Sequence, residues 1–148
     1  MKILMTEKKV NNFKIILEYI KDLSIETPSA TALLKIRENL SSYNMDIDIS
    51  SLVLKNKSLE ITTKLILQDK SDKEDKAFFE IKYATVISID SSVIDKKIIS
   101  KIVLCDLQKI IYPKIEKIFI DLIKNAGYPN IRFEKKVDFE KMYNDKFN

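Results

Sequence analysis

The chain of 148 residues contains no His, one Gly and one Cys, and its 26 Lys and Arg against 22 Asp and Glu give a formal net charge of +4 at pH 7. Without His it lacks the commonest general acid and base and the commonest metal ligand, and a single Gly excludes the glycine-rich loops that bind phosphates and dinucleotides. We therefore expect no enzyme, no catalytic residue, no cofactor and no metal site. The lone Cys105 allows no intramolecular disulfide, which fits a reducing compartment, and we expect it to be a buried, unreactive thiol.

The N-terminal residues are interrupted by charged side chains such as Glu7, Lys8 and Lys9. They lack the continuous apolar stretch of a signal peptide or a membrane helix. We therefore expect a cytoplasmic protein with a flexible N-terminus at 1–12 and a single domain at 13–148.

Alternating apolar and polar residues in the first half of the chain predict four β-strands. The first covers 13–26, and the next two cover 45–54 and 58–68. The charged stretch 70–76 is too polar to bury and predicts an exposed hairpin connection to a fourth strand at 77–89. The second and third strands each have one apolar and one polar face, which is typical of a half-buried antiparallel sheet. In the first strand, Ile16 and Ile20 make the early part apolar on both faces.

After residue 90 the apolar period changes from 2 to about 3.6, which predicts helices. A capping box of Ser92 and Asp95 predicts a helix start near residue 93, and Pro113 predicts a break or kink. An apolar stripe runs along 114–125, and Asp138 is placed to cap a short final helix. Strands followed by helices predict an α+β fold, in which a four-stranded antiparallel sheet carries two or three helices packed on one face.

The stripe along 114–125 is flanked by Ile110 and Ile120, so it carries more apolar surface than one sheet needs. This favours contact with further copies of the chain. Isolated exposed isoleucines in an Ile-rich protein are the alternative. The predicted interface residues are Ile115, Ile118, Phe119 and Leu122.

Two segments carry a resemblance to a known family. They are YIKDLSIETPSA at 19–30, and AGYPNIRF at 126–133 followed by VDFEKMY at 137–143. Together they resemble the SecB protein-export chaperones, and the similarity extends over about residues 13–145 in the same order. The resemblance implies a homotetramer, built as a dimer of dimers, with the longer helices sandwiched between sheets.

The resemblance also implies a function. A SecB-type chaperone holds unfolded precursor proteins in apolar grooves without ATP and passes them to SecA, the translocase motor ATPase. The residues that match the family's contact surface for SecA are Asp22, Glu26, Phe78 and Glu80. Apolar residues that could line the groove, with an ordinary core position as the alternative for each, are Ile47, Ile49, Ile131, Phe133, Phe139, Met142 and Tyr143.

Two departures from the family pattern affect these expectations. Family members are usually acidic, whereas this chain is net basic, which should weaken attraction to the basic tail of SecA. In addition, Leu107 and Gln108 stand where the family commonly has Cys-Pro, which could alter the connection between the helices.

Two other functions stay open at this point. One is a SecB-like holdase dedicated to a specific partner such as an antitoxin and not coupled to export. The other is a basic nucleic-acid-binding adaptor. The second is disfavoured because Arg, which binds phosphates and bases in a bidentate manner, occurs only at Arg37 and Arg132.

Overall fold

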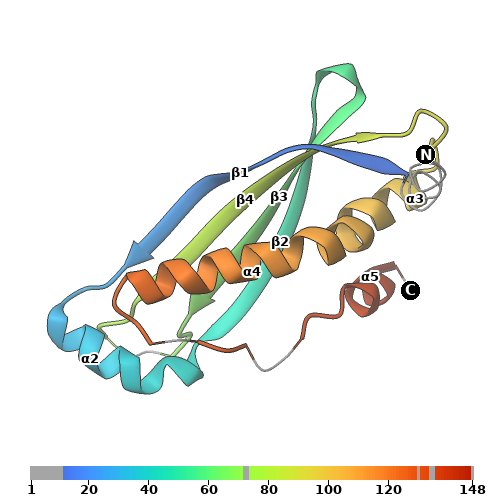
Figure 1. Cartoon of the computed structure of the whole chain (residues 1–148). Helices are drawn as coiled ribbons and strands as arrows, with labels where there is room; N and C mark the ends of the chain where they lie inside the picture. The colour runs from blue at the N-terminus through green and yellow to red at the C-terminus, as the bar shows by residue number, and fades with distance from the viewer. Residues whose placement is uncertain (1–11, 72–73, 130, 134–135, 148) are drawn as a thin grey trace, which may run out of the picture.

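The chain folds into an antiparallel sheet with helices on one of its faces (Figure 1). This computed structural model describes residues 12–71, 74–129, 131–133 and 136–147. Three predicted features extend beyond the described residues: the flexible terminus at 1–11, part of the charged connection at 72–73, and Asn130 of the second motif.

The sheet consists of β1 (Phe13–Glu26), β2 (Asn44–Val53), β3 (Ser58–Gln68) and β4 (Phe78–Ile89). All neighbours are antiparallel, in the order β1-β4-β3-β2, so β1 and β2 are the two edges. The predicted fold class is therefore confirmed. Each strand lies within one residue of its predicted bounds, because successive side chains of a strand point to opposite faces and the alternation follows those faces.

A helix that the sequence interpretation missed lies between the first two strands. It is α2 (Ala30–Asn39), and the Ser29 hydroxyl caps its first turn by accepting from the Ala32 amide at 3.1 Å. Its Ala32 and Ile36 are buried. The signal was present in the sequence, since Ser29 is a favoured N-cap residue and the apolar residues that follow recur at helical spacing.

The second half of the chain forms α3 (Lys96–Lys101), a π-helical turn (Ile102–Asp106), α4 (Leu107–Asn125) and α5 (Phe139–Phe147). Asp95 caps α3 by accepting from the Lys97 amide at 2.9 Å, so the helix begins three residues later than predicted. Asp138 accepts from the Lys141 amide at 3.1 Å, as expected of the cap of α5.

The break predicted at Pro113 is wrong, because α4 continues through this residue. Pro113 lies on the exposed side of the helix, so the Lys109 carbonyl that loses its amide partner can face solvent. The irregularity lies upstream instead, in the π-helical turn, where the Leu107 amide donates to the Ile102 carbonyl five residues earlier.

The core fills the space between α4 and the face of the sheet that it covers. Side chains with no exposed surface come from α4 and from the central strands, and they include Ile111, Ile115, Phe119, Ile123, Ile61, Leu65, Phe79 and Ile81. Burial of each such side chain contributes about 1.5–3 kcal/mol. The side chains of Ile115 and Phe119 are fully buried within the single chain, so they have no surface left to contact a second copy of the chain. The structure therefore assigns both residues to the core and not to the predicted interface.

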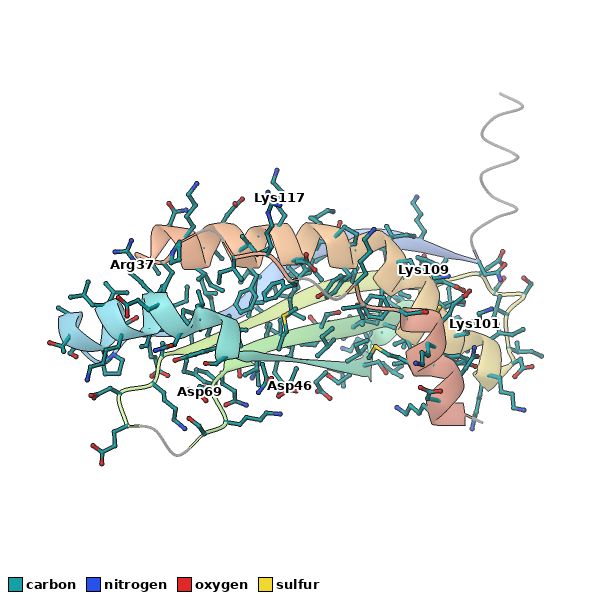
Figure 2. All side chains as sticks on the ribbon, turned by 90° about the horizontal axis from the view of Figure 1, so that it is seen from below. Arg37, Asp46, Asp69, Lys101, Lys109 and Lys117 are labelled. Atoms are coloured by element: carbon teal, nitrogen blue, oxygen red, sulfur yellow. The ribbon has the colours of Figure 1, made fainter. Side chains whose placement is uncertain are left out.

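Of the predicted interface residues, Ile118 and Leu122 are only partly buried in the single chain. The side of α4 that points away from the sheet is largely polar, and Figure 2 shows Lys117 there. Cys105 is fully buried at the start of this region, and burial raises the pKa of its thiol. Both properties agree with the predicted unreactive thiol.

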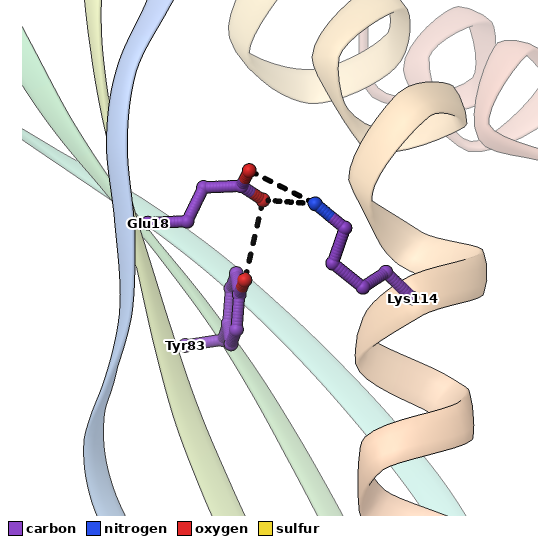
Figure 3. A network of polar contacts seen from close by, with 3 residues as sticks. All are labelled: Glu18, Tyr83 and Lys114. Carbon is purple, nitrogen blue, oxygen red and sulfur yellow. Dashed lines mark hydrogen bonds and ion pairs between the residues drawn. The ribbon is translucent and has the colours of Figure 1, made fainter.

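A polar contact holds α4 against the β1 side of the sheet (Figure 3). The Lys114 ammonium group donates to both oxygens of the Glu18 carboxylate at 3.0 and 2.9 Å, and the Tyr83 hydroxyl donates to one of them at 3.2 Å. Hydrogen bonding to Glu18 raises the pKa of Lys114. The three residues come from α4, β1 and β4, so the contact joins the helix to two strands.

Candidate functional site

An apolar groove lies between the edge strand β2 and the C-terminal helix α5. Its volume is about 170 Å³, and its lining residues are Ile47, Asp48, Ile49, Leu104, Met142, Tyr143 and Lys146. Four of the residues predicted to line a client groove therefore meet here, although they come from opposite ends of the sequence.

Strand alternation supplies one wall of the groove. Ile47 pairs with Leu65 and Ile49 with Thr63, so both isoleucines lie on the face of the sheet that packs against α4. They are only partly buried. Because β2 is an edge strand, nothing in the described part of the chain pairs with its outer side.

The opposite wall comes from the π-helical turn and from α5. Leu104 lies in the turn, and Met142 remains 43% exposed although it is a large apolar side chain. The Tyr143 hydroxyl donates to the Lys97 carbonyl at 3.3 Å, which connects this wall to α3. The groove is therefore open to solvent and lined mainly by side chains that can take up further apolar contact.

Two contacts at the start of α5 hold this helix in place. Phe139 is 4% exposed and packs edge-on against Tyr112 of α4, with ring centroids 5.2 Å apart. Glu140 accepts from Lys109 at 2.9 Å, and this hydrogen bond lowers the pKa of the Glu140 carboxyl. The structure thus assigns Phe139 to the core, which corrects its prediction as a groove residue.

The structure does not bring Ile131 and Phe133 into the groove. Both are partly buried and pack against the hydrophobic core in the segment between α4 and α5. The sequence shows that this extended stretch carries apolar side chains, but it does not show which surface of the protein those side chains pack against.

A larger hollow, of about 270 Å³, lies between α2 and the connection from β3 to β4. Most of its lining is polar or charged, with both signs present: Lys35, Ile36, Glu38, Asn39, Tyr43, Asp69, Glu74, Asp75 and Lys76. A charged surface of this kind is a poor binding site for apolar side chains. The hollow is therefore a weaker candidate for the client site than the smaller apolar groove.

The predicted contact residues for SecA lie together on the other face of the sheet. The register sets Glu26 opposite Phe78 and Ser24 opposite Glu80, and residues that are opposite each other share a face. Asp22 lies two residues before Ser24 and therefore on the same face. The structure thus unites Asp22, Glu26, Phe78 and Glu80 at one end of β1 and β4, on the surface that α4 does not cover.

This surface is not purely acidic. Lys82 pairs with Asp22 across the strands, and its ammonium group lies 4.0 Å from the Glu80 carboxylate. Part of the negative charge is therefore compensated locally.

A second polar network on the same face was not anticipated from the sequence. The Glu60 carboxylate of β3 accepts hydrogen bonds from the Tyr19 hydroxyl and, at 3.1 Å, from the Lys21 ammonium group of β1. Both bonds lower the pKa of Glu60, which is only 9% exposed. The contact spans the intervening strand β4, so only the strand order and register could have revealed it.

Two kinds of site have no candidate among the described residues. No group of His, Cys, Asp and Glu there could hold a metal ion. In the same ranges, no helix is both long enough and apolar enough to span a membrane.

Comparison with known proteins assigns the chain to a family. Residues 6–148 match the family model described as preprotein translocase subunit SecB. A putative protein-export protein SecB from Pelagibacter ubique (strain HTCC1062) is 43% identical over 137 residues, which cover 93% of this chain and 98% of that protein. The protein-export protein SecB of Rhodopseudomonas palustris (strain BisB18) is 27% identical over 87% of this chain and 77% of its own length.

A solved structure has the same fold. It is the SecB-like chaperone of Mycobacterium tuberculosis in complex with a peptide from the HigA1 antitoxin, with a TM-score of 0.64 and 11% sequence identity. The likeness covers 88% of this chain and 92% of that one. The family match over nearly the whole chain, together with the identity to the Pelagibacter protein, shows that this chain belongs to the SecB family of protein-export chaperones.

Proposed function

We propose that the chain is a chaperone that holds unfolded precursor proteins in the groove between β2 and α5. The observation that carries this proposal is the convergence of Ile47, Ile49, Met142 and Tyr143 on one open apolar surface. Asp48 and Lys146 are the charged residues of its lining. A flexible Met beside aliphatic and aromatic side chains suits varied clients.

Binding energetics favour a client that occupies several grooves at once. One buried large apolar side chain contributes roughly 1.5–3 kcal/mol, whereas association costs on the order of 4–15 kcal/mol. A groove of about 170 Å³ takes only one or two such side chains. Tight holding therefore requires several copies of the groove on one particle. Client holding uses no nucleotide, because a chain with a single Gly has no glycine-rich phosphate-binding loop.

Removal of apolar groove contacts should weaken client holding. We predict that Ile47→Ser with Met142→Ser lowers client affinity by more than tenfold, since each lost contact is worth roughly 1.5–3 kcal/mol. The measurement is the delay that the chaperone imposes on the refolding of a denatured precursor, with no nucleotide present. Leu34→Ser is the matched control, because Leu34 is 62% exposed on α2, at the other end of the molecule. A requirement for ATP, or equal loss in the control, would contradict the proposal.

We propose further that the active particle is a homotetramer, a dimer of dimers. The free edge strand β1 carries exposed apolar side chains, namely Ile16, Leu17, Tyr19, Ile20 and Leu23. A long apolar edge strand offers unpaired backbone groups that favour pairing with another chain. On α4, Ile110 is 47% exposed, and Ile118 and Leu122 keep part of their surface.

The native mass tests this assembly. Light scattering at micromolar concentration should give about four times the chain mass of 17.2 kDa. Ile118→Asp should lower that mass or destabilise the fold, because an unpaired charge in a buried contact costs several kcal/mol. A clean monomer in the parent protein would exclude the assembly.

The proposal places the protein in the cytoplasm and includes delivery of the client to SecA. It is supported by the clustering of Asp22, Glu26, Phe78 and Glu80 on the uncovered face of the sheet. The compensating Lys82 means that recognition depends on the arrangement of these side chains more than on net charge.

Charge reversal on this surface tests the delivery step. We predict that Asp22→Lys with Glu80→Lys abolishes SecA binding in a titration while client holding and native mass stay as in the parent. A double change is needed because an exposed ion pair contributes only about 0–1 kcal/mol. The control is Glu38→Lys with Asp121→Lys, which changes the net charge equally at exposed positions on α2 and α4. If the control fails equally, net charge is responsible and the contact surface is misassigned.

A chaperone dedicated to one partner is the second candidate. The observation in its favour is that the similar Mycobacterium tuberculosis chaperone is seen with an antitoxin peptide. In that case the parent protein would hold a client but would not bind SecA at all, so the same titration separates the two functions.

A further inference from the structure

A buried hydrogen-bonded link crosses the core beneath the groove. The Thr63 hydroxyl donates to the Gln108 side-chain oxygen at 3.1 Å, and the Gln108 side-chain nitrogen donates to the Val103 carbonyl at 3.4 Å. Thr63 and Gln108 are both 0% exposed. The link therefore joins β3, α4 and the π-helical turn in a region from which water is excluded.

Each end of this link is adjacent to one wall of the groove. Thr63 pairs directly with Ile49 of β2, and Val103 immediately precedes Leu104 in the π-helical turn. Ile49 and Leu104 both line the groove. The covalent and hydrogen-bonded path from one wall to the other thus passes through the side chain of Gln108.

Apolar packing alone would not fix the distance between these walls. The hydrophobic effect is non-directional, so an apolar helix could shift on an apolar sheet with little change in buried area. A buried hydrogen bond is directional, and loss of one partner leaves the other polar group unsatisfied in the core. Gln108 also binds the carbonyl of a residue in the π-helical turn, so it connects the position of that irregular turn to the sheet.

We propose that Gln108 is a positioning residue that sets the separation of the groove walls and, through it, client affinity. This inference rests on the proposed function of the groove. Gln108 is fully buried and is not among the residues that line the groove. Its effect is transmitted by Thr63 to Ile49 on one side and by Val103 to Leu104 on the other.

The chain offers a closely matched pair of substitutions for the test. Thr63→Val removes the hydroxyl that binds Gln108, with almost no change in shape. Thr85→Val removes a hydroxyl that is also 0% exposed but has no hydrogen-bond partner among the described residues. Both threonines lie in central strands, so the pair differs in the link and not in burial.

The readouts are client affinity and the geometry of the walls. Affinity is measured with reduced and carboxymethylated α-lactalbumin, which stays unfolded without denaturant. Geometry is the separation of the Ile49 and Leu104 side chains in crystal structures of the parent and the variants. We expect Thr63→Val and Gln108→Met to change this separation and to weaken binding roughly tenfold. Thr85→Val should match the parent, and Thr63→Ser, which keeps the hydroxyl, should recover most of the affinity that Thr63→Val loses.

The outcomes are distinguishable. If Thr63→Val and Gln108→Met are folded and keep both the parent wall separation and the parent affinity, Gln108 is a core residue only and the inference is wrong. If the parent itself does not bind the unfolded α-lactalbumin, the proposed function fails, while the wall separation still decides whether Gln108 positions the groove.

Discussion

The packing of α4 on one face of the sheet is the constraint on which the other features depend. Its inward stripe, with Ile111, Ile115, Phe119 and Ile123, has no exposed surface left. The helix thereby occupies the middle of this face, while the edge strand β2 extends beyond it (Figure 1). The apolar side of β2 is then covered only in part, by the π-helical turn and α5, and the uncovered remainder is the groove. No helix in the described part of the chain covers the opposite face of the sheet.

Polar contacts help to orient α4 on this apolar face of the sheet. Thr63 of β3 pairs with Tyr83 of β4. The side-chain hydroxyl of each forms a hydrogen bond that leads to α4. Gln108 binds Thr63 directly, and Lys114 reaches Tyr83 through the Glu18 carboxylate. The Lys114 contact is partly exposed and contributes about 0–1 kcal/mol, whereas the Gln108 contact is fully buried and its loss is expected to cost more. Of these two polar contacts, the buried one lies on the side of the groove, because Thr63 pairs with Ile49.

Local patterns in the sequence predicted the strands well and the long-range contacts poorly. Successive side chains of a strand point to opposite faces, so alternation was a sufficient signal for the strands. The helix α2 was missed although Ser29 and the spacing of Ala32 and Ile36 were informative. Pro113 was overinterpreted as a break, because the sequence does not reveal that its side of α4 faces solvent.

The candidate site was predictable only in part for a similar reason. The fold brings Ile47, Ile49, Met142 and Tyr143 together at one groove, and their role in client binding stays a prediction, whereas Phe139 is buried in the core. Periodicity identifies an apolar face but does not tell a filled interior from an open groove. The links through Gln108 and Glu60 depend on strand order and register, which no local pattern encodes.

The most direct test of the account is to locate a bound client on the chaperone. A photoreactive benzophenone amino acid is introduced at position 142 in one variant and at position 34 in another, both of which are exposed in the structure. The account predicts that irradiation in the presence of unfolded α-lactalbumin joins the client to position 142 and not to position 34. Cross-linking at position 34 alone, or equally at both, would contradict the assignment of the groove between β2 and α5 as the client site.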